Sequence, residues 1–276
     1  METNFERTKW SIRGIDFSPT GKYVATYHEQ GIALWVYTPH YASMKDSKAK
    51  GVWSRSHRFK HDSVDNLQFS PDERYLVTGN GGRGDQHSTV TVHEVLHQSE
   101  KRKFTVPLTN ESGQLEWPHL KWSSDSRYFA RQTPDCVSIY EMPHCGLLDK
   151  KSIKCPGVRR FLWSPKDNIL SYWVPEAGEA PARVTLLGIP RRNEIRVKNL
   201  YNVHNIEMSW QDQGKFLAVR VDRPVKETVP NHSTFYHSNT FINTYCPINR
   251  FRKSAQSRST YHFKSINNRI YSNALN

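Results

Sequence analysis

Two histidines and a glutamate in residues 93–97 have the spacing of a zinc peptidase motif. His93, Glu94 and His97 form H-E-x-x-H, which on a helix places both histidines on one face to bind zinc while the glutamate acts as a base. The preceding residues 88–92 alternate β-branched side chains, which predicts a strand instead. In a strand the two histidines would be about 13 Å apart, too far to share a metal ion. We therefore expect no metal site here.

Residues 79–84 contain glycines with the spacing of a dinucleotide-binding loop. G-x-G-x-x-G would offer backbone amides to a pyrophosphate if it followed a strand and opened a helix. The next segment predicts another strand, so no helix dipole is expected. The pattern therefore favours a hairpin loop, in which Arg83 can attract phosphate.

The cysteines offer little chemistry. His144 and Cys145 could be a base and a nucleophile, but adjacent loop residues do not supply the oriented geometry that thiolate catalysis needs. The chain has no C-x-x-C pair, which predicts reduced thiols and no structural zinc. The four positions are Cys136, Cys145, Cys155 and Cys246.

Basic clusters lie between the predicted strands, and the formal net charge is +13. Such an excess favours a polyanionic partner such as nucleic acid or a ribosome. For any one cluster, a merely solvated surface is an equally good interpretation. Collectively the clusters could contact the phosphates of ribosomal RNA, with residues 191–198 as the first choice. The candidate contacts are Arg191, Arg192, Arg196, Lys198, Lys150, Lys151, Lys154, Arg159 and Arg160.

A short sequence pattern, repeated five times along the chain, predicts the strands and turns that position these residues. Each copy has a strand ending in an aromatic residue, a turn rich in serine, proline, aspartate or glycine, and a second apolar strand, which is the pattern of a hairpin. The aromatic residues recur at intervals of 52, 53, 41 and 47 residues. They are Phe17, Phe69, Trp122, Trp163 and Trp210.

A third strand is predicted after each of the first four copies, at residues 31–35, 90–94, 136–141 and 182–187. A two-sheet sandwich would also use short strands, but five copies in phase favour a propeller. The period-2 pattern excludes helical solenoids. We predict an all-β, WD-repeat-like β-propeller with about five blades and an incomplete ring.

The loops between the repeats resemble a known family. Residues 146–152, 173–176, 181–186 and 194–200, with the strands at 31–35 and 69–78, are similar to the WD-repeat propeller of the B subunit of eukaryotic translation initiation factor 3. The resemblance spans roughly residues 10–223. It implies a propeller that lies against the small ribosomal subunit, preceded by an RNA-recognition domain and followed by a helical tail that, with the other flanking segment, holds further subunits. It implies no catalytic residue.

The composition changes near residue 224. Residues 231–276 contain no aspartate or glutamate, although the rest of the chain contains all 26 of them. This predicts a partial propeller at 1–223 and a basic, acid-poor tail at 224–276. The tail is either disordered or the product of a translated intron or shifted frame. Its interleaved aromatic residues leave open single-stranded RNA binding.

The resemblance implies a non-catalytic scaffold of translation initiation, located in the cytoplasm, and the sequence patterns give no reason to expect cofactors or metal. Its expected partners are other subunits of the factor and the small ribosomal subunit with its RNA, and no membrane or small-molecule substrate is expected. Two alternatives remain. The chain could be a truncated or degenerate paralogue without initiation activity, or a WD-repeat module of another complex.

Overall fold

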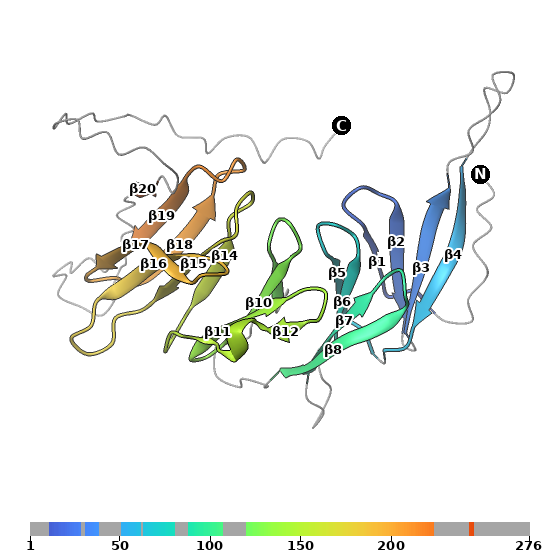
Figure 1. The fold of residues 1–276 in the computed structure, drawn as a ribbon, viewed down its shortest axis with the longest axis horizontal. Coiled ribbons are helices and arrows are strands. Elements are labelled where there is room, and N and C mark those ends of the chain that lie inside the picture. The colour runs from blue at the N-terminus through green and yellow to red at the C-terminus, as the bar shows by residue number, and fades with distance from the viewer. Residues whose placement is uncertain are drawn as a thin grey trace, which may run out of the picture.

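The computed structural model describes residues 11–28, 31–38, 51–61, 63–80, 88–106, 120–223 and 243–245. Within these ranges the chain forms five antiparallel sheets that follow one another in sequence. Figure 1 shows the sheets side by side in an open arc, with β1 and β19 in the sheets at its opposite ends. The predicted all-β class and the partial propeller are confirmed, because each sheet corresponds to one copy of the repeat.

Each of the first, second and fourth sheets is a meander of four strands. The first contains β1 (Gly14–Phe17), β2 (Tyr23–His28), β3 (Gly31–Thr38) and β4 (Val52–Phe59). The second contains β5 (Asn66–Phe69), β6 (Tyr75–Asn80), β7 (Ser88–Glu94) and β8 (Ser99–Val106). The fourth contains β14 (Arg160–Trp163), β15 (Ile169–Val174), β16 (Ala182–Gly188) and β17 (Asn193–Leu200).

The third sheet divides its outer strand around a 3-10 turn, η1 (Leu148–Lys150). Both β12 and β13 pair with β11, one before the turn and one after it. Its strands are β9 (Leu120–Trp122), β10 (Tyr128–Thr133), β11 (Cys136–Glu141), β12 (Gly146–Leu147) and β13 (Ile153–Lys154).

The fifth sheet takes one strand from the segment predicted as a tail. It contains β18 (Asn205–Trp210), β19 (Leu217–Asp222) and β20 (Asn243–Tyr245). Tyr245 pairs with Leu217, the register position that Trp35 and Tyr140 occupy in their own sheets. Apart from β20, residues 224–276 lie outside the described residues, so the division of the chain at residue 224 stays a prediction.

The turn between the first two strands of a sheet explains why serine follows the aromatic residue in four of the five copies of the repeated phrase. The Ser70 hydroxyl oxygen accepts a hydrogen bond of 3.0 Å from the Tyr75 amide and donates one of 2.6 Å to Asp72. Ser123 bonds Tyr128 and Asp125 in the same way. The side chains thus satisfy backbone donors that a tight turn leaves unpaired.

The core lies between the sheets rather than within them. Trp122, from the third sheet, packs against Tyr75, Val77 and Phe129, so its cluster joins the second and third sheets. Corresponding clusters join the first to the second, the third to the fourth and the fourth to the fifth sheet. Since each sheet packs mainly on its neighbours in sequence, the stack of sheets is the element that positions every surface loop.

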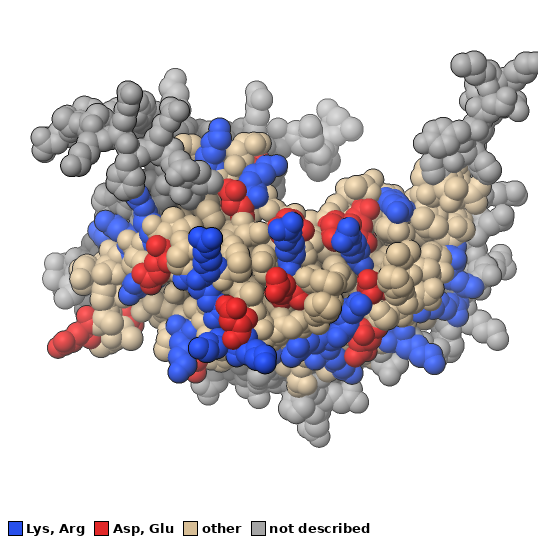
Figure 2. Space-filling view, in the orientation of Figure 1, with Lys and Arg blue, Asp and Glu red and all other residues tan. Residues whose placement is uncertain are grey.

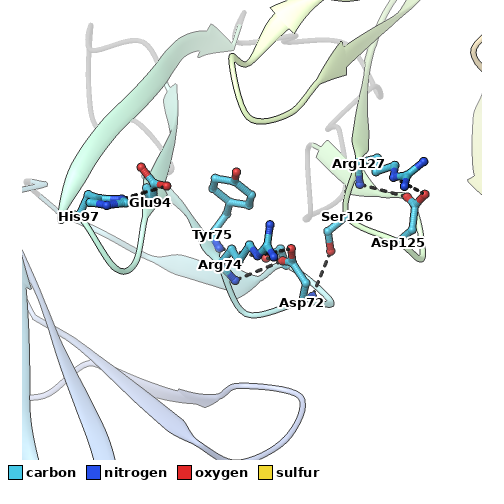
Figure 3. A network of polar contacts seen from close by, with 9 residues as sticks. Asp72, Arg74, Tyr75, Glu94, His97, Asp125, Ser126 and Arg127 are labelled. Atoms are coloured by element: carbon cyan, nitrogen blue, oxygen red, sulfur yellow. Dashed lines mark hydrogen bonds and ion pairs between the residues drawn. The ribbon is translucent and has the colours of Figure 1, made fainter.

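Polar contacts between turns reinforce this stack. The Asp72 amide donates a hydrogen bond of 3.0 Å to Ser126 Oγ across the junction of the second and third sheets, as Figure 3 shows. Glu73 accepts a bond of 2.7 Å from the Thr20 hydroxyl at the preceding junction. Asp125 accepts one of 2.8 Å from Asn168 at the next. The turns therefore align along one end of the stack.

Candidate functional site

Four of the predicted basic residues lie at the end of the sheets opposite the serine turns. Arg160 pairs with Trp173, Trp173 with Val184, and Val184 with Lys198, so Arg160 and Lys198 stand at the same end of the fourth sheet. Three strand spacings separate their backbones by about 14 Å. All four side chains are exposed. We call this set the loop-side cluster: Lys154, Arg159, Arg160 and Lys198.

The connection from the third to the fourth sheet positions this cluster. Lys154 pairs with Cys136 at the turn between β10 and β11. The amides of Cys155 and Gly157 then donate to the carbonyl oxygens of Asp135 and Pro134, at 2.9 and 3.0 Å. These bonds hold the connection against the third sheet, so Arg159 and Arg160 emerge beside Lys154.

Arg192 contacts the neighbouring sheet. Its guanidinium donates to the carbonyl oxygens of Leu148 and Lys151, both at 2.6 Å, and Arg192 Nε lies 3.7 Å from an Asp149 carboxylate oxygen. These bonds join the β16–β17 turn to η1 of the third sheet. Because its Nη2 donates to two carbonyl oxygens of the third sheet, Arg192 serves as a clasp between sheets.

The clasp brings other predicted residues together. Lys150 and Lys151 are exposed on the η1 segment that Arg192 holds, and Arg191 is exposed on the turn that carries the clasp. We call Lys150, Lys151 and Arg191 the outer cluster. Arg196 is exposed further along β17.

The residues 191–198, read from the sequence as one cluster, are therefore spread along the fourth sheet. Arg191 precedes β17, whereas Lys198 stands near its other end, and the strand rises about 3.3 Å per residue. The nine candidates form at least two groups rather than one patch. Figure 2 shows lysine and arginine over the whole visible face, with carboxylates between them and a denser group along the lower edge of the arc.

The basic residues 101–103 on β8 mostly serve the fold. Lys101 forms an ion pair of 2.7 Å with Glu94. Arg102 donates to the Cys145 carbonyl at 2.9 Å and lies over the rings of Phe104 and Tyr140. The Lys101 ion pair lies within the second sheet and the Arg102 contacts reach the third sheet, so both basic side chains have partners within the protein.

The H-E-x-x-H residues lie at the end of strand β7, as predicted. His93 is buried, whereas His97 is exposed in the following turn, where its Nδ1 lies 3.2 Å from Glu94 Oε1. Among the described residues no group of three potential metal ligands is close enough to hold a metal ion. The strand geometry therefore rules out the helix that the zinc peptidase motif requires.

His93 belongs instead to a buried chain of hydrogen bonds. Thr78 Oγ1 lies 3.1 Å from His93 Nε2 and 2.7 Å from His61 Nδ1, and His61 Nε2 lies 3.2 Å from Thr89 Oγ1. Since a hydroxyl carries one proton, Thr78 donates to at most one of the two rings, so at least one ring nitrogen donates to its oxygen. Burial, with a smaller contribution from the nearby His61, lowers the pKa of His93 to about 4. Sequence inspection missed His61, which shares no motif with His93.

The thiol chemistry considered from the sequence is also disfavoured. Burial raises the pKa values of the Cys145 and Cys155 thiols to about 11. A thiol is nucleophilic only as its thiolate, so both are unreactive near neutral pH. The glycine-rich pattern begins in β6, and β7 pairs with β6 after it, which confirms the predicted hairpin. Residues 81–87, including Arg83, lie outside the described residues.

Comparisons with known proteins identify the origin of this arrangement. No protein-family model matches the chain. The B subunit of eukaryotic translation initiation factor 3 from Xenopus laevis is 42% identical over 225 residues, which are 81% of this chain. The Bombyx mori protein of the same name is 43% identical over 220 residues. Four fifths of this chain is homologous to part of that B subunit. The resemblance noted in the sequence is confirmed.

The chain spans about 30% of the length of these B-subunit relatives. A solved structure described as a crystal structure of the eukaryotic initiation factor has a TM-score of 0.62 over 80% of this chain and 52% of its own. At 21% identity that likeness shows the fold alone. Within the described residues no helix has the length and apolar character needed to cross a bilayer.

Proposed function

We propose that this chain is a non-catalytic scaffold of translation initiation: a propeller platform that contacts the small ribosomal subunit within initiation factor 3. The observation that supports this most is the 42% identity to the B subunit over 225 residues, a span long enough to include loops and outer strands as well as the core. Core packing alone constrains the amino-acid sequence of such loops only weakly. Cytoplasmic location and partnership with other subunits of the factor follow from the same proposal.

The exposed basic residues supply a physical means of binding. The loop-side cluster presents four cations at one end of two adjacent sheets, and the outer cluster adds three more on the side of the same sheets. Lysine and arginine attract the phosphates of RNA largely without regard to sequence, and binding weakens as salt rises. A platform for a folded RNA surface needs this kind of contact rather than a pocket.

The buried thiols and the absence of a helix at His93 and His97 support a role without catalysis. Neither group has the reactive geometry that its motif would need. The prediction that the chain has no enzymatic activity is therefore part of the proposal.

Cosedimentation with purified small ribosomal subunits tests the proposal. The full chain should bind, and replacing Lys154, Arg159, Arg160 and Lys198 with alanine should weaken binding at least tenfold. Loss of phosphate contacts should also reduce the slope of log affinity against log salt by about 0.7–0.9 per contact. A second variant, with alanine at Lys150, Lys151 and Arg191, measures how much the outer cluster contributes to binding.

The serine turns offer a matched control. Arg74 and Arg127 are exposed and face Asp72 and Asp125 of their own turns, with nitrogen-to-oxygen distances of 3.5 and 3.7 Å. Alanine at Lys22, Arg74, Arg127 and Lys215 removes equal charge from the opposite end of the sheets. This control should bind nearly as the parent chain does. Equal losses of affinity in both variants would mean that binding depends on net charge and not on the loop-side cluster. Failure of the parent chain to bind would contradict the proposal.

A further inference from the structure

The junctions between sheets repeat one aromatic contact. Phe69 of the second sheet stacks on Tyr23 of the first, with 6.4 Å between ring centroids and 15° between planes. Trp122 stacks on Tyr75 in the same way, at 5.6 Å and 13°. Trp163 stacks on Tyr128, at 6.5 Å and 17°. At each of these three junctions, an aromatic ring from one sheet therefore covers a tyrosine of the sheet before it.

The positions of the two rings follow a rule. The covering ring immediately precedes the turn serine of its own sheet, as Trp122 precedes Ser123. The covered ring comes five residues after the turn serine, as Tyr128 follows Ser123. The rule predicts which rings of the first and last sheets would take part in further junctions.

Within the described part of the chain, the first sheet presents a covering ring with no sheet beneath it. Phe17 precedes Ser18 and is 63% exposed, whereas its counterparts Phe69 and Trp122 are 5% and 8% exposed. Ile15 is 56% exposed, although its counterpart Leu120 is buried. Large apolar side chains at such exposure on one strand indicate an interaction surface. We call Ile15 and Phe17 the leading flank.

The fifth sheet presents the complementary ring. Phe216 comes five residues after Gln211, which stands at the turn position of that sheet, and it is 42% exposed. Tyr75 and Tyr128, its counterparts inside the stack, are 4% and 6% exposed. Ala218, two residues further along the chain on β19, corresponds to the buried Ala130 and lets another sheet approach closely. We call Phe216 and Ala218 the trailing flank.

The turn contacts leave matching positions at both flanks. At the internal junctions, the residue two positions after the turn serine of one sheet contacts a residue three or four positions after the turn serine of the next sheet. Asp72 contacts Ser126 in this way in Figure 3. At the flanks these positions are Gln213 in the fifth sheet and Gly21 in the first. No atom lies within 4 Å of a Cβ built at Gly21, so a neighbouring turn has room there.

We propose that the leading flank of one copy packs on the trailing flank of a second copy, so that the chain associates with itself head to tail. A second copy is the occupant because the chain carries both halves of its own repeated junction. Phe17 of one copy then stacks on Phe216 of the other, as Trp122 stacks on Tyr75. An interface between two different surfaces joins copies into a ring or a linear assembly. This association does not depend on the ribosomal role.

Light scattering after size-exclusion chromatography of the full chain tests the proposal. The parent chain should have a mass of at least twice 32.2 kDa at tens of micromolar. Phe17→Asp and Phe216→Asp should each yield monomers with unchanged circular dichroism, because both side chains are exposed. Leu96→Asp is the control, since Leu96 is 73% exposed on a turn of the second sheet, away from both flanks, and it should leave the mass unchanged.

Mixing the two monomeric variants decides the geometry. The Phe17→Asp chain keeps its trailing flank and the Phe216→Asp chain keeps its leading flank, so one intact junction forms and a heterodimer of twice the monomer mass should appear. A dimer joined by two leading flanks would not be restored in this way. A folded, monomeric parent chain overturns the proposal. A mass insensitive to both variants overturns it as well.

Discussion

The indole of Trp122 lies nearly parallel to the phenol ring of Tyr75, with 5.6 Å between their centroids and 13° between their planes. The two residues belong to different sheets, and both are buried. Stacked aromatic pairs contribute about 0.5–1.5 kcal/mol beyond the burial of their surfaces. This contact therefore stabilises the packing of the third sheet on the second.

Replacing Trp122 with alanine should lower the free energy of unfolding by about 3–5 kcal/mol, because it leaves a cavity between two sheets. Urea denaturation followed by tryptophan fluorescence measures the change. Leu96→Ala, at a residue 73% exposed, should change stability by less than about 0.5 kcal/mol. Similar effects of the two substitutions would contradict the assignment of the core to the junctions.

The junction between turns should contribute less. Ser126→Ala removes the acceptor of the Asp72 amide and should cost about 1 kcal/mol in the free energy of unfolding. Ser126 also has a φ of 58°, a left-handed conformation that glycine adopts without strain. Ser126→Gly should therefore destabilise less than Ser126→Ala when both are measured by urea denaturation. The reverse order would contradict a strained backbone at this position.

Acid should destabilise the second sheet through His93. The folded-state pKa of His93 is about 4, below the ordinary value of 6.5, so between these values the unfolded chain binds the extra proton. The free energy of unfolding should then fall as pH drops from 6.5 towards 4, by about 1.4 kcal/mol per pH unit at most from this group.

His93→Gln provides the comparison for this pH dependence, because glutamine can hydrogen-bond to Thr78 but does not titrate in this range. Urea denaturation of both chains between pH 7 and pH 4.5 should give a shallower decline for the variant. Parallel declines would mean that other groups cause the acid sensitivity.

The buried thiols should resist alkylation. With pKa values raised to about 11, Cys145 and Cys155 have roughly a hundredfold less thiolate at pH 8 than a thiol of ordinary pKa 9.0. Iodoacetamide labelling followed by peptide mass spectrometry should find them protected in the folded chain and reactive in urea. Cys136, which is only partly buried, is the internal comparison. Rapid labelling of Cys145 in the folded chain would contradict its burial.

The repeated phrase was sufficient to predict the sheets because every copy encodes its own local turn. Ser70 and Ser123 fold their turns with hydrogen bonds to residues within five positions, so the signal is fully contained in the sequence. The strand that carries His93 was predictable for the same reason. Local periodicity therefore identified the fold class and the sheet order.

The candidate site was less predictable because it depends on register and on contacts between sheets. Arg191 and Lys198 are seven residues apart in sequence, yet a strand carries them to different ends of the fourth sheet. Arg192 reaches carbonyl oxygens more than forty residues away, and no local pattern indicates those acceptors. Linear clusters of charge therefore indicated exposed loops but not how their side chains are grouped in space.

The packing of each sheet on its sequence neighbours also has a mechanical consequence. Among the described residues the first and fifth sheets each have one junction instead of two, so force applied to the two chain ends would load these sheets first. Unfolding in an optical trap should then proceed in steps from the ends, each releasing one repeat of about 48 residues, or roughly 160 Å of extended chain. The third sheet, in the middle of the series, would be the last to yield.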